Sequence, residues 1–404
     1  PVCGRYTPLV GNWWLARVGE KGTYKRLAWM EWDNGIKVID LNKKCREEKG
    51  GSCNKLVAKV TTRDEEGGTI EWRNNKYKVP TKNIEPKKET AQCLYCKAEI
   101  NHRVINGQIR KPQKKKEGEW YIKWVLKQWN TNLERYLRGE ISLDESLKSS
   151  ARPRFLVKVK TINGDLEFEP ATEQDNEKLW KALERLRAIW GDPDIPTEQI
   201  SPYSNRYLFP ILYGFDKWFK FFNPRQLLAL VKFVKLIREV GKKVEEEKLR
   251  EGWNKEDAFK YAEAITTYLA IALVRFASHY SIVTQADVAN PWGLKIANTL
   301  AYRGIAMQWN WGDMNPFIDF GNLTGSLTRS IKKIVESLEY LVDAVSGSPS
   351  RARVSLDDAT ALNKLNDEKF DVIVADPPYA DDVPYTELSD FYFVWMKRAL
   401  SDSD

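Results

Sequence analysis

Short runs of alternating apolar and polar residues dominate residues 13–80. Glycine and asparagine separate the runs, as in Asp33-Asn34-Gly35 and Glu66-Gly67-Gly68, and these residues favour tight turns. Runs of this length and alternation are typical of strands. We therefore expect a small antiparallel β module with strands at Leu15–Val18, Arg26–Met30, Ile36–Ile39, Leu56–Val60 and Thr69–Trp72.

A helical period follows a basic stretch at residues 111–117. It predicts a helix at Tyr121–Leu137, a hairpin that starts with Phe155–Thr161 and turns at Asn163-Gly164, and a helix at Glu173–Trp190. We interpret this part as an inserted α+β module. A proline-rich junction at 191–202 precedes a mainly helical region, with helices predicted at Pro224–Glu247, Lys255–Tyr280, Trp292–Tyr302 and Leu323–Val345.

The period changes again near the C-terminus. Arg353–Leu356 reads as a strand ending at Asp357-Asp358, followed by a helix, and Phe370–Ala375 reads as a buried strand. The second strand ends in the tetrad Asp376-Pro377-Pro378-Tyr379. A β-α-β unit with an apolar central strand implies a parallel sheet covered on both faces. The carboxyl ends of such strands are where open α/β sheets bind ligands.

Composition narrows the choice of protein class. A chain of 404 residues with 42% hydrophobic residues and mixed charges favours two or three globular domains and excludes a disordered chain. The net charge of +8 suits a polyanionic partner, although a basic protein with no nucleic-acid role is the alternative. Heavy use of lysine, glutamate and tryptophan with 2 histidines resembles a hyperthermophile's composition. We see no long apolar run or signal-peptide pattern, so we expect a cytoplasmic protein without a membrane segment.

The tetrad has the groups needed to hold an exocyclic amine for methylation. The lone pair of such an amine is delocalised into its base, and acceptors for both N–H bonds draw the nitrogen toward tetrahedral geometry. Asp376 can accept one bond and the Pro377 carbonyl the other, while Pro378 stiffens the turn. Tyr379 can stack on a base rotated out of a duplex. The alternative is a plain turn, since aspartate and proline are ordinary turn formers.

Two cysteine segments predict a metal site. Cys93-Leu94-Tyr95-Cys96 is a CxxC knuckle, and Pro1-Val2-Cys3-Gly4 is similar to the tail of a second knuckle whose first cysteine would precede Pro1. Cys3, Cys93 and Cys96 are therefore candidate zinc ligands, with the fourth supplied by His102, Cys45 or Cys53. A metal-free site and a redox pair are the alternatives. For Cys45 and Cys53 themselves a disulfide, a metal or neither is open.

The region around the tetrad resembles a known family. Residues 370–379, continued by Tyr385, Leu388–Tyr392 and Trp395–Arg398, are similar to the archaeal and bacterial adenine-specific DNA methylases that contain a zinc ribbon. Phe222–Leu228 and Trp309–Phe317 also resemble segments of that family. The resemblance implies methyl transfer from S-adenosylmethionine to N6 of an adenine flipped out of double-stranded DNA. Aspartate at the first tetrad position is typical of adenine targets in similar families.

The resemblance also implies a fold and a missing part. It divides the chain into a β-rich zinc-ribbon-like module (1–110), an α+β insertion (111–205), a helical region (206–350) and the C-terminal part of a Rossmann-like methyltransferase sheet (351–404). The fold class is then a multidomain α/β protein. The family's Phe-x-Gly-x-Gly cofactor loop does not occur in this sequence, so we expect an upstream fragment or a second subunit to carry it.

Further candidate residues each have a structural alternative. Asn223, Arg225 and Gln226 are expected at the cofactor or target base, although Asn223-Pro224 also fits a helix start. Asp357 and Asp358 are expected near the cofactor's adenine or at a helix N-cap. Trp309, Trp311 and Phe317 could contact nucleic acid or belong to the core, and His279 is expected to be packed in a helix.

Two other functions are compatible with these patterns. One is a non-catalytic DNA- or RNA-binding module, or part of a split enzyme, in which the tetrad is vestigial. The other is a methyltransferase acting on cytosine N4, RNA or a protein amide.

Overall fold

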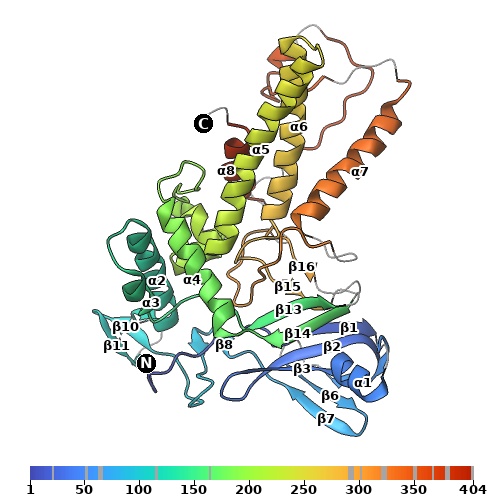
Figure 1. Ribbon diagram of the computed structural model, residues 1–404. Helices are drawn as coiled ribbons and strands as arrows, with labels where there is room; N and C mark the ends of the chain where they lie inside the picture. The colour runs from blue at the N-terminus through green and yellow to red at the C-terminus, as the bar shows by residue number, and fades with distance from the viewer. Residues whose placement is uncertain are drawn as a thin grey trace.

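The computed structural model describes twelve stretches of the chain: 1–20, 22–50, 53–61, 67–113, 117–162, 165–289, 295–300, 303–319, 325–348, 353–365, 368–377 and 383–401. Small antiparallel sheets occupy one end of the molecule, and the long helices α5, α6 and α7 project from the other (Figure 1). The fold therefore mixes helices with small sheets.

The predicted N-terminal strands form, except that Leu56–Val60 is divided between two short strands of different sheets. β2 pairs with β1, β3 and β4, all antiparallel, and β5, β6 and β7 form a second sheet. Tryptophans at 13, 14, 29 and 72 belong to the core of this module. Residues 26–30 of β2 are all buried, because both faces of this strand are covered. The strands are β1 (Trp14–Glu20), β2 (Thr23–Trp32), β3 (Ile36–Asp40), β4 (Leu56–Val57), β5 (Lys59–Thr61), β6 (Gly68–Trp72) and β7 (Asn75–Val79).

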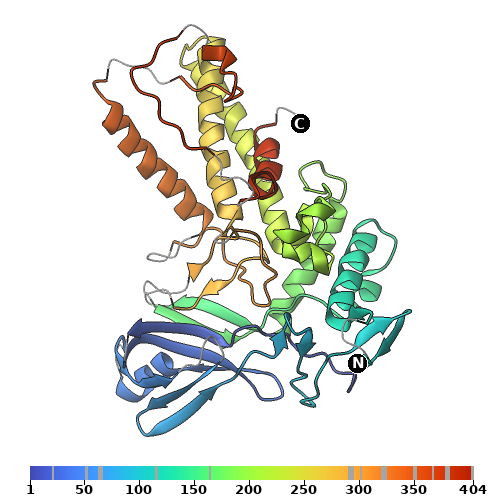
Figure 2. The ribbon, with the colours of Figure 1, turned by 180° about the vertical axis from the view of Figure 1, so that it is seen from behind.

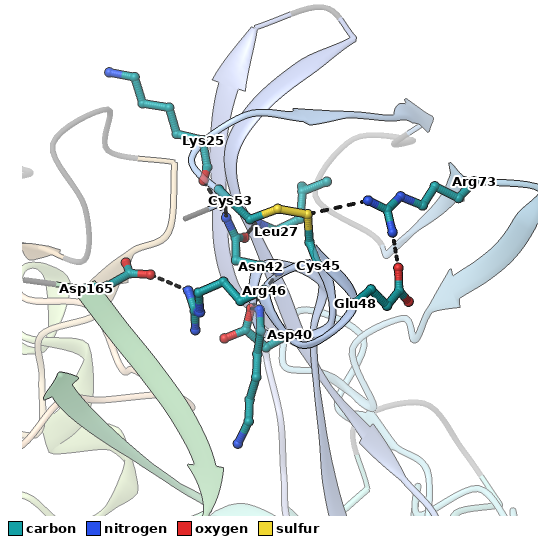
Figure 3. The surroundings of a disulfide bond; sticks show 11 residues. Lys25, Leu27, Asp40, Asn42, Cys45, Arg46, Glu48, Cys53, Arg73 and Asp165 are labelled. Carbon is teal, nitrogen blue, oxygen red and sulfur yellow. Dashed lines mark hydrogen bonds and ion pairs between the residues drawn. A yellow bond between two sulfur atoms is a disulfide. The ribbon is translucent and has the colours of Figure 1, made fainter. Parts of the chain in front are cut away.

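A short helix, α1 (Leu41–Lys49), was not predicted from the sequence. Asp40 caps its first turn by accepting the N–H groups of Asn42 and Lys43. A Cys45–Cys53 disulfide, shown in Figure 3, ties the helix to the segment before β4. Of the alternatives for these two cysteines, the structure has the disulfide, so neither is available as a fourth metal ligand.

The inserted module also follows the prediction. α2 (Tyr121–Leu137) has the predicted bounds, and α4 (Glu173–Ala188) ends two residues before the predicted end. The hairpin of β13 (Val157–Ile162) and β14 (Asp165–Pro170) forms, while its turn at 163–164 lies outside the described residues. The smaller elements nearby are β8 (Ile84–Glu85), β9 (Thr90–Ala91), β10 (Arg103–Ile105), β11 (Gln108–Arg110), β12 (Glu119–Trp120) and α3 (Leu143–Leu147).

A large apolar core holds the helical region together. α5 (Pro224–Arg250) and α6 (Lys255–Ala277) pack side by side, and α8 (Tyr385–Ala399) inserts the buried rings of Phe391 and Trp395 against Phe222. α7 (Leu327–Val345) leaves the core after its first turn, as Figures 1 and 2 show. The 3₁₀ helices of the described residues are η1 (Pro202–Arg206), η2 (Phe209–Tyr213) and η3 (Trp218–Phe221) in this region and η4 (Asn363–Leu365) nearer the C-terminus.

The helix predicted at Trp292–Tyr302 is wrong in its described part. Residues 295–296 form the strand β16 (Lys295–Ile296), which pairs with β15 (Ala286–Asp287), and residues 297–300 are not helical. The backbone hydrogen bonds of this segment go to a neighbouring strand instead of to its own preceding turn. Among the described residues, no helix is both long and apolar enough to cross a membrane.

The predicted β-α-β unit near the C-terminus is not formed by the described residues. Residues 353–356 and 370–375 have no strand partner, and the described part of the intervening segment contains only η4. Val354 and Ile373 are 95% and 83% exposed, although the pattern predicts buried strands. A parallel strand needs neighbours on its flanks to satisfy its backbone groups, and no described strand lies beside these segments. The buried-strand prediction is therefore corrected for this structure.

Candidate functional sites: a thiol cluster and a cavity beside Asp313

Three cysteine thiols meet at one point near the N-terminus. The Sγ atoms of Cys3, Cys93 and Cys96 all lie within 4.8 Å of one another, and the first two are 3.7 Å apart. Cys93 is buried, whereas Cys3 and Cys96 are exposed. Three thiolates at this spacing could hold a metal ion such as zinc, which prefers sulfur ligands in a tetrahedral arrangement.

The backbone around the cluster has matching turns on both sides. Gly4 and Lys97, each directly after a cysteine, have φ of 70° and 60°. The Cys93 carbonyl accepts the N–H of Lys97, which closes the knuckle. Burial raises the pKa of the Cys93 thiol, but hydrogen bonds from the backbone of Cys96 and Tyr95 outweigh it, so the pKa lies below its ordinary value. His102 does not belong to this cluster as the structure describes it.

The predicted cofactor residues Asn223, Arg225 and Gln226 begin α5. The Asn223 side chain accepts the N–H groups of Arg225 and Gln226, and Gln226 Oε1 accepts the N–H of Asn223 in return. Asn223 and Gln226 are buried, at 3% and 0% exposure. The helix-capping alternative is therefore confirmed for Asn223, and Gln226 is its partner in the capping box.

The same helix start holds a buried carboxylate from another part of the chain. Asp313 Oδ2 lies 3.2 Å from Asn223 Nδ2, which donates to it, and 3.1 Å from Arg225 Nε. Gln226 Nε2 donates to the Gly312 carbonyl at 3.1 Å. The structure thus brings Phe222–Leu228 and Trp309–Phe317, the two shorter segments that carry the family resemblance, into direct contact.

The carboxylate of Asp313 is buried and only partly hydrogen-bonded. Its side chain is 4% exposed, and its Oδ1 atom has no hydrogen-bond partner among the described residues. Burial raises the pKa of this carboxyl, although the Arg225 charge and the Asn223 hydrogen bond lower it. An unpartnered buried acceptor costs about 1–3 kcal/mol, so a donor that reached Oδ1 would recover that cost.

A cavity of about 670 Å³ opens beside this carboxylate. Its walls come from β1 and β2, from the β13–β14 hairpin, from the start of α5 and from residues 308–315. Phe155, Trp309 and Trp311 supply aromatic surface, and Arg225 and Asp313 supply charge. A volume of this size lies within the range of pockets that hold small organic ligands, about 300–1,000 Å³.

Asn310 fixes one wall of the cavity to the N-terminal module. Its Oδ1 accepts the N–H groups of Gly11 and Asn12 at 2.7 and 2.9 Å, and its Nδ2 donates to the Asn12 carbonyl at 3.1 Å. A Cβ at Gly11 would lie 3.3 Å from Trp309 Cβ, so the two segments approach closely. Three hydrogen bonds made by one partly buried amide fix the position of this wall.

The aromatic candidates of the segment Trp309–Phe317 differ in their position relative to the cavity. Trp309 and Trp311 are partly buried and line the cavity, whereas Phe317 is 65% exposed and lies outside it. His279 is 7% exposed, with Nδ1 2.9 Å from the Ile296 carbonyl, and burial lowers its pKa. The prediction of a packed His279 is confirmed.

The tetrad and the acidic pair lie elsewhere. Asp376 and Pro377 are exposed, and Pro378 and Tyr379 lie outside the described residues. Asp358 is exposed and accepts from Thr360, and hydrogen bonds from Thr360 lower its pKa, while Asp357 accepts from the N–H of Lys364. Asp358 thus caps a turn. None of the described residues of 353–377 lines the cavity.

Sequence reasoning missed Asp313 and Phe155. Asp313 is the single charged residue of the segment Trp309–Phe317, and a lone charge among aromatic and polar neighbours could have indicated a functional carboxylate. No protein-family profile matches the chain, and neither the curated proteins nor the solved structures contain a significant match.

Proposed function

We propose that this chain is the target-base part of an S-adenosylmethionine-dependent methyltransferase that acts on N6 of adenine in DNA. The observation that carries the proposal is the apolar segment 370–375, which leads into Asp376 and Pro377 and lies unpaired on the surface. Val372, Ile373 and Val374 are 76%, 83% and 90% exposed. Burying one such side chain is worth about 1.5–3 kcal/mol, so the segment gains if it becomes a sheet strand.

The chemistry of the segment supports an amine substrate. Asp376 is exposed, so its carboxylate is free to accept one N–H bond of an exocyclic amine. The Pro377 carbonyl would accept the other, and Tyr379 would stack on the base. The remaining Rossmann-like strands would pair with 353–356 and 370–375 and bury their apolar side chains.

The described residues do not by themselves form a site for the methyl donor. The sequence has no Phe-x-Gly-x-Gly loop, and Asn223 and Gln226 are occupied by each other and by the 312–313 backbone and carboxylate. S-adenosylmethionine would supply an electrophilic methyl group when bound. We propose that a companion fragment or subunit carries the glycine loop.

The test is methylation by the chain together with its glycine-loop companion, using labelled methyl donor and duplex DNA. Asp376→Ala should lower the rate at least 100-fold because one amine acceptor is lost. Asp371→Ala changes the same residue type at the exposed start of the segment and should keep the wild-type rate. Wild-type turnover by the Asp376 variant would refute the proposal, and nucleoside analysis separates N6-methyladenine from N4-methylcytosine.

We also propose that Cys3, Cys93 and Cys96 bind zinc. Metal analysis of the purified chain should then give one zinc ion per chain, and Cys93→Ser should lose it because thiolate ligands dominate closed zinc sites. Cys45→Ser alters a disulfide cysteine outside the cluster and should keep the metal. Equal zinc content in wild type and Cys93→Ser would contradict the assignment.

A further inference from the structure

The cavity beside Asp313 has features of a ligand site that the tetrad does not use. It lies at the lower end of α5, next to the β13–β14 hairpin, whereas the segment 353–377 runs by the far ends of α5 and α6 (Figures 1 and 2). The two places are therefore separate, and the inference below does not depend on methyl transfer.

Asp313 contributes one carboxylate oxygen that lacks a hydrogen-bond donor among the described residues. Its Oδ2 is already engaged by Asn223 and Arg225, while its buried Oδ1 has no partner among the described residues. Asp313 lines the cavity, but Oδ1 itself is covered by protein atoms, so the carboxylate must shift for a ligand group to reach this atom. A carboxylate oxygen accepts hydrogen bonds, so the matching ligand group is an N–H or O–H donor.

The walls favour a flat ring. Phe155 and Trp311 lie with their ring centroids 5.7 Å apart at 60°, so they are tilted instead of stacked on each other. Both rings line the cavity, and Trp309 adds a third. Aromatic side chains of this kind stack on nucleobases, whose faces are also π systems.

Positive charge surrounds the ring-binding part. Among the described lining residues the basic side chains outnumber the acidic ones: Lys82, Arg154, Lys158, Lys178 and Arg225 stand against Asp175 and Asp313. Lys158 and Lys178 share the carboxylate of Asp175, at 3.1 and 3.2 Å, and Lys158 also lies 3.9 Å from Glu169. Arg154 pairs with Glu173 and Lys82 with Glu85, and these three glutamates do not line the cavity. Asp175 and Arg225 lie in the first turns of α4 and α5, and Ser326 caps α7, so three helix N-termini meet the cavity. Helix N-termini add partial positive charge, which favours a phosphate.

We propose that this cavity binds a nucleotide whose base carries an exocyclic amine. The amine donates to Asp313 Oδ1, the base lies against Phe155 and Trp311, and the phosphate faces Lys158 of β13 and Lys178 of α4. The same chemistry could come from a free nucleotide or from a base within a single strand of DNA.

The first experiment measures binding by tryptophan fluorescence and calorimetry with adenosine monophosphate and with purine riboside monophosphate, which lacks only the amine. Wild type should bind the amine-bearing nucleotide at least tenfold more tightly. Equal affinities, or no binding of either at millimolar concentration, would overturn the proposal. Adenosine without phosphate should bind at least fivefold more weakly than its monophosphate, and an equal affinity would overturn the phosphate part.

Asp313→Asn gives a sharper test because the neighbours dictate how the amide is oriented. Asn223 Nδ2 and Arg225 Nε are both donors, so the amide oxygen must face them and the NH₂ group must face the cavity. A donor then opposes the ligand's amine, and the preference for the amine-bearing nucleotide should vanish. A preference that persists at tenfold would contradict the assigned contact.

A second variant keeps the proposal testable if the Asp313 change disturbs folding. Trp311→Leu removes a wall and should weaken binding of both nucleotides at least fivefold. Phe317→Leu changes an exposed ring of the same segment outside the cavity and should leave binding unchanged. Equal weakening by both substitutions would refute the assigned wall.

An oligo(dA) strand distinguishes the two sources. Binding at least 100-fold tighter than that of the mononucleotide supports a base within a strand. Comparable binding supports a free nucleotide. Competition between the two ligands is expected in either case, and failure to compete would refute a shared site.

Discussion

Strands are predicted both in residues 14–79 and in residues 353–377, but within the described residues only the first region forms them. Ile70 in the alternating strand β6 is 0% exposed, while Ile373, in a more continuously apolar run, is 83% exposed. β6 pairs with β5 on one side and β7 on the other, but no described strand pairs with residues 370–375. Local pattern makes a segment able to form a strand, and a neighbour with free backbone groups makes it one.

The comparison separates two sources of stability. In the N-terminal module apolar burial and ladder hydrogen bonds arise together, since turns at 33–35 and 73–74 bring each strand back beside the previous one. In the C-terminal segment any partner must come from elsewhere. If burial decides stability, Ile70 and Ile373 should differ in their contribution to the free energy of unfolding as they differ in exposure.

The largest effect is expected at Ile70. Ile70→Ala leaves a cavity between the two sheets and should lower the free energy of unfolding of the N-terminal module by about 3 kcal/mol. Urea unfolding followed by tryptophan fluorescence measures this loss, because the core of the module contains several tryptophans. Ile70→Val, which removes one methylene, should cost only about 1 kcal/mol. An equal loss in the two variants would mean that packing at this position is not what the burial indicates.

The outcome at Ile70 depends on a strand that sequence reasoning found, but its neighbour β7 was missed. Its polar composition explains this: residues 75–78 include two lysines and only Tyr77 is apolar, so the strand shows no clear apolar–polar alternation. The turn at Arg73 and Asn74, both with positive φ, makes the pairing. The helix α1 was not predicted for a similar reason: its sequence is polar, and its Asp40 cap is the one local signal of a helix start.

The candidate sites are harder to predict from the sequence than the strands and helices are. The helix start at Asn223 follows from a capping residue and a proline that are adjacent in the sequence, whereas the helix predicted from Leu323 begins at Leu327, after its cap Ser326. The contact between Asn223 and Asp313 joins residues 90 positions apart and depends on how α5 packs, which no local pattern specifies. The three cysteines are the intermediate case, because their knuckle spacing is local but their meeting is not.

A smaller loss is expected at Asn42, which ties the disulfide loop to β2 (Figure 3). Its Nδ2 donates to the carbonyls of Lys25 and Cys53 at 2.7 and 2.8 Å, and its Oδ1 accepts the N–H of Leu27 at 3.0 Å. Asn42→Ala strands these buried groups and should cost about 2 kcal/mol in urea unfolding. Asn75→Ala, at an exposed asparagine of β7, should stay within about 0.5 kcal/mol. Similar losses at both positions would show that burial of the amide is unimportant.

The two regions should also differ in the sign of their pH dependence. Burial raises the pKa of Asp40 above its ordinary 3.8, and its Oδ2 has no hydrogen-bond partner among the described residues. A raised folded-state pKa contributes stability that is full below pH 3.8 and is lost as the pH rises through the higher value. Asp40→Asn keeps a good helix cap and should remove that loss, so its stability relative to wild type should increase from pH 4 to pH 7.

The exposed Asp358 is the matched opposite. Hydrogen bonds from Thr360 lower its pKa, so any contribution is present above its ordinary 3.8 and disappears as the pH falls. Asp358→Asn should therefore lose stability relative to wild type as the pH rises above 3.8. Unfolding curves at several pH values measure both variants, and the same sign of slope in both would contradict the assigned causes.

The smallest effect is expected at Ile373, where the chain alone should barely respond. Ile373→Ala removes the same side-chain atoms as Ile70→Ala, but from a position with little burial to lose, so its effect on urea unfolding should stay below about 0.5 kcal/mol. A loss above about 1 kcal/mol would mean that residues 370–375 already pack against a partner within this chain. If the glycine-loop companion of the proposed methyltransferase supplies the missing strands, the same substitution should weaken its binding by about fivefold or more, since about 1 kcal/mol of apolar burial is then at stake. An exposed isoleucine that matters only in the complex would show that the strand pattern at 353–377 is satisfied between chains.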